Sequence, residues 1–336
     1  MNLHRIFETL SKAIFIGLVF IFAGNAIAQT VKNEIRYLQM DVFTDTPLSG
    51  NQLAVFLDPE GLSDEMLIKL TKEMNFSETT FLYPAGKEGT DFRVRIFTPS
   101  RPNEMPIAGH PTVGTVFALA NLGLIGPKQN ELVLELGIGP TPIKLEWDND
   151  KLAFAWMKQR LPKFGGIIED KRAVAEALGI KVADFGSSNL PIQMVDCGAP
   201  FIMVPLATRD AVDRAIMDRQ RMGALIDKAG LTRRGMFLFS MEPGDDGATI
   251  YSRMLGFGVT EDPATGNASG PAGSYLVHYG LVDKSKEQNI ISRQGVKMGR
   301  SSEIRIAVTT RDDEITDVQI GGSAVQVSDS VLKIQN

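Results

Sequence analysis

Two stretches of the sequence place an ionisable residue beside proline and small residues. Asp262 stands in EDPATGNASGPAG, residues 261–273, and His110 stands in GHPTVGT, residues 109–115. Proline fits the first turn of a helix, where N–H groups lack partners, and small side chains let a ligand approach those groups. Each stretch therefore predicts an anion-binding helix start. The alternative is a well-packed helix start that binds nothing.

A third titratable residue, Glu78, stands in NFSETT, residues 75–80, which we expect to be a loop between a helix and a short strand. Phe76 and Phe81 flank it. Apolar surroundings disfavour a charged carboxylate, so they raise its pKa toward the range of a general base. The alternative is a solvated or capping glutamate, which is the commoner fate of this residue type. The residues alone do not choose between the two.

The elements around these residues are mostly short strands, with few helices and no regular alternation of strand and helix. This order predicts the α+β class rather than a doubly wound parallel sheet. The expected helices are 62–74, with Ser63 as its cap, 171–178 and 211–229. The expected strands are 35–42, 52–57, 81–83, 92–98, 131–136, 142–147, 152–157, 201–205, 236–240 and 249–255.

Residues 93–125 and 250–282 repeat one pattern. In each, a strand carrying arginine runs into a loop, and an ionisable residue, His110 or Asp262, then precedes Pro-x-x-Gly. An apolar helix follows and ends at Gly-Leu. This order indicates a duplicated domain. Two helix starts, one from each half, would then hold one small carboxylate-bearing molecule between them.

Several motifs resemble the PhzF family of phenazine-biosynthesis-like isomerases, which share the diaminopimelate epimerase fold. The matching stretches are DVFTDTPLSGNQLAVF (41–56), NFSETTFL (75–82), RIFTPSRPNEMPIAGHPTVGT (95–115), EDPATGNASGPAGSYL (261–276) and RQGVKMGRSS (293–302). The resemblance implies two pseudo-repeated domains, each a curved mixed β-sheet or barrel around a central helix. It places them at 31–150 and 151–336, with the last strand able to return to the first domain, and the active site in the cleft between them. It also implies a homodimer and no metal or organic cofactor.

The same resemblance assigns roles to individual residues. Glu78 corresponds to the family's acid–base residue, and His110 and Asp262 line the same cleft. The backbone at Gly109 and at Gly266-Asn267 would hold the substrate carboxylate, and Asn51 and Ser77 complete the substrate-binding set. The sequence departs from the family at Asn267, where PhzF itself has serine, and at Gly50-Asn51-Gln52, where Gly-Asn-Pro is frequent. Both departures bear on the substrate more than on the class of reaction.

Composition excludes several classes of function. The net charge of −5 among 336 residues argues against a protein that neutralises nucleic-acid phosphates. Cys197 is the single cysteine, so neither a disulfide within the chain nor a two-cysteine epimerase is possible. We expect it to be a buried small hydrophobic residue. With three histidines in all, one of them near the N-terminus, a multi-histidine metal centre is not expected.

The first 28 residues predict a secretory signal. Arg5 and Lys12 provide a basic start, residues 13–24 form an apolar run, and Ala26-Ile27-Ala28 has the small-x-small form of a cleavage site. The apolar run is shorter than a membrane-spanning helix. We therefore expect cleavage after Ala28, export to the periplasm and no stable membrane association afterwards. The alternative is an uncleaved N-terminal anchor.

Together these observations predict an isomerase in which Glu78 moves a proton between carbons of a small carboxylate-bearing substrate. The alternative is an exported protein that binds an amino-acid-like molecule without turning it over. The titratable residues favour the enzyme, because binding alone does not need a base in an apolar pocket.

Overall fold

The computed structural model describes residues 33–186, 189–258 and 261–334. The expected signal sequence, residues 1–28 with its cleavage site after Ala28, lies outside the described residues. None of the helices in the described part of the chain is both long enough and apolar enough to cross a bilayer.

The strands form one mixed sheet of 16 strands, in the order β16-β1-β2-β3-β4-β5-β6-β7-β15-β14-β13-β12-β11-β10-β9-β8. Its first half consists of β16 (Ala324–Lys333), β1 (Glu34–Val42), β2 (Asn51–Leu57), β3 (Glu78–Pro84), β4 (Phe92–Phe97), β5 (Glu131–Leu136), β6 (Gly139–Asp148) and β7 (Lys151–Lys158). Its second half consists of β15 (Glu314–Gly322), β14 (Ser302–Arg311), β13 (Ile290–Gln294), β12 (Ile250–Gly256), β11 (Gly235–Ser240), β10 (Pro200–Pro205), β9 (Gln193–Asp196) and β8 (Lys163–Ile167).

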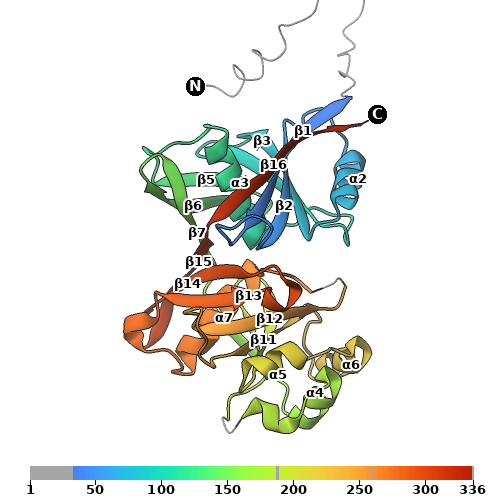
Figure 1. The fold of residues 1–336 in the computed structure, drawn as a ribbon, viewed down its shortest axis with the longest axis vertical. Coiled ribbons are helices and arrows are strands. Elements are labelled where there is room, and N and C mark those ends of the chain that lie inside the picture. Colours follow the sequence, from blue (N-terminus) through green and yellow to red (C-terminus); the bar gives the residue numbers. More distant parts are fainter. Residues whose placement is uncertain (1–32, 187–188, 259–260, 335–336) are drawn as a thin grey trace, which may run out of the picture.

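Each half of the sheet curls around one helix and forms a lobe (Figure 1). Helix α3 (Gly109–Asn121) contacts β1, β2, β3, β7 and β16, and α7 (Gly266–His278) contacts β9, β10, β14 and β15. The remaining helices are α2 (Asp64–Met74) in the first lobe and α4 (Lys171–Leu178), α5 (Arg209–Arg214) and α6 (Arg219–Lys228) in the second. The α+β class is thereby confirmed. Strand pairing between β7 and β15 joins the lobes.

The two lobes repeat one pairing pattern. Strand β2 is parallel to β3 and β4 is parallel to β5, while the other neighbours in that half are antiparallel. In the second lobe β10 is parallel to β11 and β12 is parallel to β13, with antiparallel neighbours elsewhere. Helix α3 follows β4 as α7 follows β12. The predicted repeat is present as two lobes of the same topology.

The structure corrects how the two sequence segments align. Gly109 and Gly266 each begin the central helix of a lobe, so the residue equivalent to His110 is Asn267 rather than Asp262. Asp262 forms a bridge with β12, as Met105 does with β4. The mismatch arises because Pro111-x-x-Gly114 lies within the first turns of α3, whereas Pro263-x-x-Gly266 ends at the first residue of α7.

The predicted division of the chain at residue 150 falls in the turn between β6 and β7. Strand β16 leaves the second lobe and pairs with β1, from Glu34↔Lys333 to Val42↔Ala324. Figure 1 shows this last strand crossing the first lobe, so the chain ends near where its described part begins.

Three expectations about local structure were wrong or incomplete. Glu78 is the first residue of β3 and not part of a loop. The expected helix 211–229 is two helices, α5 and α6. The guanidinium of Arg253 explains the break, because it donates to the carbonyls of Val212, Asp213 and Ala215 and so ends α5. Strands β8, β9 and β13 to β15 were not expected at all.

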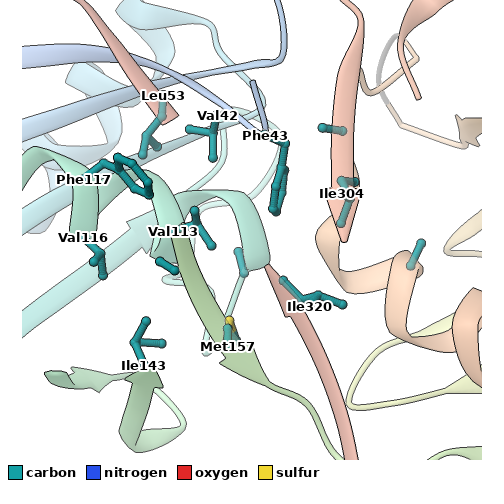
Figure 2. Packing of buried hydrophobic residues seen from close by; sticks show 14 of the residues in the cluster. Val42, Phe43, Leu53, Val113, Val116, Phe117, Ile143, Met157, Ile304 and Ile320 are labelled. Carbon is teal, nitrogen blue, oxygen red and sulfur yellow. The ribbon is translucent and has the colours of Figure 1, made fainter. Parts of the chain in front are cut away.

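The core of the first lobe is built around α3. Figure 2 shows Val113, Val116 and Phe117 of this helix among apolar side chains of the surrounding strands. All three are buried, Val113 and Val116 completely. An apolar helix enclosed by strands on all sides cannot shift without opening this core. The start of α3 is therefore held in a fixed position.

Candidate active site

The starts of the two central helices meet where the lobes join. A Cβ added to Gly109 would lie 3.0 Å from the Cα of Gly266, and a Cβ added to Gly266 would lie 3.2 Å from the Cα of Gly109. Only glycine at both positions permits this approach without displacing backbone. The small residues of both stretches thus permit the contact between the two helix starts.

Both helix starts lack the side-chain cap that usually satisfies first-turn N–H groups. The N-cap residues are Ala108 for α3 and Thr265 for α7, and neither side chain accepts a hydrogen bond from the helix backbone. Two positive helix ends therefore face one region with free N–H donors. Such an arrangement can hold a carboxylate or stabilise a developing negative charge.

Asp262 is fixed by hydrogen bonds from both lobes. Its Oδ1 accepts from Asn51 Nδ2 at 2.8 Å and from Ser77 Oγ at 2.9 Å, and its Oδ2 accepts from Thr265 Oγ1 at 2.6 Å. Burial raises the pKa of Asp262, although these hydrogen bonds act in the opposite direction. The network binds the segment before α7 to the first lobe.

Two residues outside the predicted set position this network. Gln294 Nε2 donates to the carbonyl of Asp262 at 2.7 Å and to Thr265 Oγ1 at 2.9 Å. Arg300 donates to Asp41 Oδ1 at 2.6 Å and to the carbonyl of Gly50 at 2.8 Å, which holds the turn before Asn51. Both lie in the quoted stretch 293–302, but their partners are far away in the sequence, so no local signal could have assigned these contacts.

Glu261, the other acidic residue of that stretch, has a structural partner. Its two carboxylate oxygens accept from Arg253 Nε at 2.8 Å and from Arg253 Nη2 at 2.7 Å. This bidentate pair fixes both side chains. Of the two neighbouring carboxylates, Asp262 is therefore the one that faces the central helix starts.

Glu78 lies at the start of β3 and is mostly enclosed, with 19% of its side chain exposed. Burial, together with the negative charge of Asp262, raises the pKa of Glu78 to about 8. The charges of Arg234 and Arg101 act in the opposite direction. Glu78 can thus exchange a proton near neutral pH, as expected of a carboxylate in apolar surroundings.

His110 lies next to Glu78 and is buried, with its Nδ1 3.6 Å from Glu78 Oε2. Burial lowers the pKa of His110 to about 3, so the ring is neutral near pH 7. Asn51 Nδ2 is 3.2 Å from the same Nδ1, but its two hydrogens have closer acceptors in Asp262 Oδ1 and in the carbonyl of Ala264 at 2.9 Å. His110 Nδ1 therefore has Glu78 as a close neighbour, and a hydrogen bond with the backbone of Gln52 partly offsets the effect of burial on the pKa of the ring.

A cleft of about 480 Å³ opens beside these residues. Asn51, Ser77, Glu78, Asp262 and Asn267 all line it, and its walls come from both lobes. Within the described residues, Gly109, His110 and Gly266 are not among the lining residues. The structure thus brings all the predicted site residues into one region, with His110 and the two helix-start glycines behind the cleft wall.

In the described ranges, no group of three or more His, Cys, Asp or Glu side chains is arranged to hold a metal ion. Cys197 is buried, as expected, and its Sγ lies 3.6 Å from Ser274 Oγ. Burial raises the pKa of the Cys197 thiol to about 12. This thiol is a packed side chain rather than a nucleophile.

Comparison with known proteins gives consistent matches over most of the chain. The family model "Phenazine biosynthesis-like protein" (PhzC-PhzF) matches residues 40–330. An "uncharacterized isomerase" of Mesorhizobium japonicum is 35% identical over 303 residues, which cover 89% of this chain and 98% of that protein. A trans-2,3-dihydro-3-hydroxyanthranilate isomerase of Pseudomonas fluorescens is 32% identical over 291 residues, which cover 86% and 96%. The crystal structure of a PhzF-family protein from Bacillus anthracis matches with a TM-score of 0.79 at 27% identity, covering 90% of this chain and 100% of that one.

Proposed function

Since this chain belongs to the phenazine biosynthesis-like (PhzC-PhzF) family and is an isomerase, we propose that it moves a proton between two carbons of a small carboxylate-bearing substrate. In this proposal Glu78 carries the proton. The observation that supports it most directly is the position of Glu78, enclosed beside Asp262 and His110 at the wall of the cleft.

The ionised carboxylate of Glu78 removes a proton from a substrate carbon, and the electron pair of that C–H bond moves into the adjoining unsaturated system. Glu78 then returns its proton to a second carbon, so that the substrate is neither oxidised nor reduced. A pKa of about 8 suits both steps, because the same group must be a base and then an acid near neutral pH.

Carbon acids are weak, so the negative charge that develops on the substrate needs stabilisation. The free N–H groups at the starts of α3 and α7 can supply it while they hold the substrate carboxylate. Neutral His110 is the nearest side chain able to donate a further hydrogen bond, and Asp262 can do so only in its protonated form. Asn267 lines the cleft at this point, and its amide is one candidate for recognising the substrate.

The test is hydrogen exchange in D₂O, followed by NMR as loss of carbon-bound proton signals. The panel consists of small amino, hydroxy and unsaturated carboxylates and includes trans-2,3-dihydro-3-hydroxyanthranilate, for which the Pseudomonas relative is named. We expect exchange on at least one compound, reduced at least about 100-fold by Glu78→Gln, in line with the usual contribution of a general base. Glu88→Gln, at an exposed residue outside the cleft, serves as the matched control.

Full exchange by Glu78→Gln would contradict the assignment of this residue. The alternative of a binding protein without catalysis is not favoured, because the relatives are named isomerases. Tight binding of panel compounds to the wild-type protein without any proton exchange would support the binding-protein alternative.

We also propose that the chain is exported with cleavage after Ala28 and that it forms a homodimer. N-terminal sequencing of the protein recovered from the periplasm tests the first point. Light scattering of the purified protein tests the second, and a monomer mass at micromolar concentration would contradict it.

A further inference from the structure

Two arginines face the cleft from opposite lobes. Arg101 lies in the connection between β4 and α3, and Arg234 lies immediately before β11. Both line the main cleft beside Glu78, and both also line an adjoining hollow next to Asn267. Their charges act on each other and on Glu78, so the three groups share one electrostatic environment.

The repeat explains why Arg234 reaches the cleft. Strand β3 begins at Glu78 and β11 begins at Gly235, and these strands occupy equivalent places in the two lobes. The residues that lead into them, Ser77 and Arg234, therefore face the same space from opposite sides. Phe201 supports the arginine, since the guanidinium carbon of Arg234 lies 5.4 Å from the centre of its ring.

Other arginines near the site are held in ion pairs, whereas these two form none among the described residues. Arg300 pairs with Asp41, and Arg253 pairs with Glu261. Within the described part of the chain, neither Arg101 nor Arg234 has a side-chain hydrogen bond or a salt bridge. Two guanidinium groups that repel each other in a partly enclosed cleft indicate a place for an anion.

The carboxylates of the cleft do not offset this charge well. Burial raises the pKa values of both Glu78 and Asp262, which favours their neutral forms. Burial also lowers the pKa of Arg234, and the charge of Arg101 lowers it further, although the charges of Glu78 and Asp196 act in the opposite direction. At pH 7 most Glu78 side chains carry a proton, so a single substrate carboxylate at the helix starts supplies one negative charge against the two positive charges of the arginines. A second anionic group would relieve the repulsion between the two guanidinium groups.

We propose that Arg101 and Arg234 bind a second anionic group of the substrate, so that the natural substrate carries at least two negative charges. One carboxylate lies at the starts of α3 and α7, and the second group, a carboxylate or a phosphate, lies between the two guanidinium groups. This inference rests on the proposed function and narrows its substrate class.

The test compares monocarboxylates with matched ligands that carry a second anionic group; these are dianions, except that the phosphonate is partly doubly ionised near neutral pH. Calorimetry and ligand-induced thermal stabilisation measure binding to the purified protein. Butyrate is compared with succinate and with 3-phosphonopropionate, and valerate is compared with glutarate. We expect at least one dianion to bind about tenfold more tightly than its monoanionic partner, as charge-assisted hydrogen bonds in a partly enclosed site allow. The preference for succinate or for the phosphonate distinguishes a second carboxylate from a phosphate.

In the double variant Arg101→Gln/Arg234→Gln, the dianion and its monoanionic partner should bind with about equal affinity. Arg101→Gln alone changes only an exposed side chain and should reduce the advantage of the dianion about threefold, so the test does not depend on folding of the double variant. Arg233→Gln is the matched control, because Arg233 is exposed, pairs with Asp227 and does not line the cleft. It should leave the ratio unchanged.

Three outcomes would overturn the inference. The first is that no dianion stabilises the wild-type protein more than its monoanionic partner. The second is that the advantage persists in both arginine variants. The third is that the variants weaken monoanions and dianions equally, which would mean that the arginines bind the same carboxylate as the helix starts. The binding test requires no turnover, so none of these results decides whether proton exchange depends on Glu78.

Discussion

The rate of Glu78-dependent proton exchange should rise about tenfold between pH 7 and pH 9 and then level off. The reason is the enclosure of Glu78, which raises its pKa to about 8. With that pKa, about one-tenth of the Glu78 carboxylates are ionised at pH 7 and about nine-tenths at pH 9. Because only the ionised form can accept the first proton, kcat/KM should follow this fraction.

Two substitutions should move the midpoint of this profile in opposite directions. The negative charge of Asp262 contributes to the raised pKa of Glu78, so Asp262→Asn should shift the midpoint to lower pH. The charge of Arg234 lowers the pKa of Glu78, so Arg234→Gln should shift the midpoint to higher pH. His110 cannot produce the profile, because burial keeps its pKa at about 3 and its ring neutral throughout this range.

The assay is NMR-detected exchange on the compound that exchanges most rapidly, measured at substrate concentrations well below KM between pH 5 and pH 10. Circular dichroism at each pH confirms that the protein stays folded. A rate that is flat from pH 6 to pH 9, or that reaches its plateau near pH 5, would refute the reasoning. Glu78 would then behave as an ordinary solvated carboxylate, and its enclosure in the cleft would have no catalytic consequence.

Three further substitutions or conditions test how the site is held together. Gly266→Ala should lower the free energy of unfolding in urea by about 1–3 kcal/mol, because the added Cβ would lie 3.2 Å from the Cα of Gly109 in the facing helix start. Gly126→Ala is the control: a Cβ there meets nothing within 4 Å, so the free energy of unfolding should not change. Arg300→Gln should cost about 3 kcal/mol, because it leaves Asp41, 1% exposed, without its ionic partner; an unchanged urea midpoint would contradict this. Stability should fall as pH rises from about 4.5 to about 8, since folded Glu78 retains a proton that its unfolded form has lost. Glu78→Gln should make that fall smaller, and equal falls in urea midpoint for both proteins would argue against the raised pKa.

Local pattern was sufficient to predict many of the elements that surround the site. The expected helix 171–178 matches α4, and Ser63 caps α2 as predicted, accepting a hydrogen bond from Met66 N. These features depend on periodicity and on one capping side chain, both of which are local. Strand β14 also has alternating buried and half-buried residues, so the signal for this missed strand was present in the sequence.

Features that depend on distant contacts could not be predicted in this way. Helix α5 ends where it does because Arg253, some forty residues further along, binds its last carbonyls. The Arg300–Asp41 contact joins residues separated by 259 positions. The unpaired state of Arg101 and Arg234 can be recognised only once the partners of their neighbours are known. An arginine without an ion-pair partner can therefore be identified only from the complete set of ion pairs in the structure, which cannot be read from the sequence.

The duplicated topology places equivalent residues opposite each other, but the two lobes contribute different chemistry. At the start of β3 the first lobe has a carboxylate, Glu78, whereas at the equivalent start of β11 the second lobe has Gly235, preceded by Arg234. The second lobe thus provides no base at that position and provides a cation instead. A substrate between the lobes would have a proton carrier on one side and positive charge on the other. The two helix starts remain equivalent, whereas the strand starts have diverged: in the proposed mechanism Glu78 moves the proton and Arg234 binds an anionic group of the substrate.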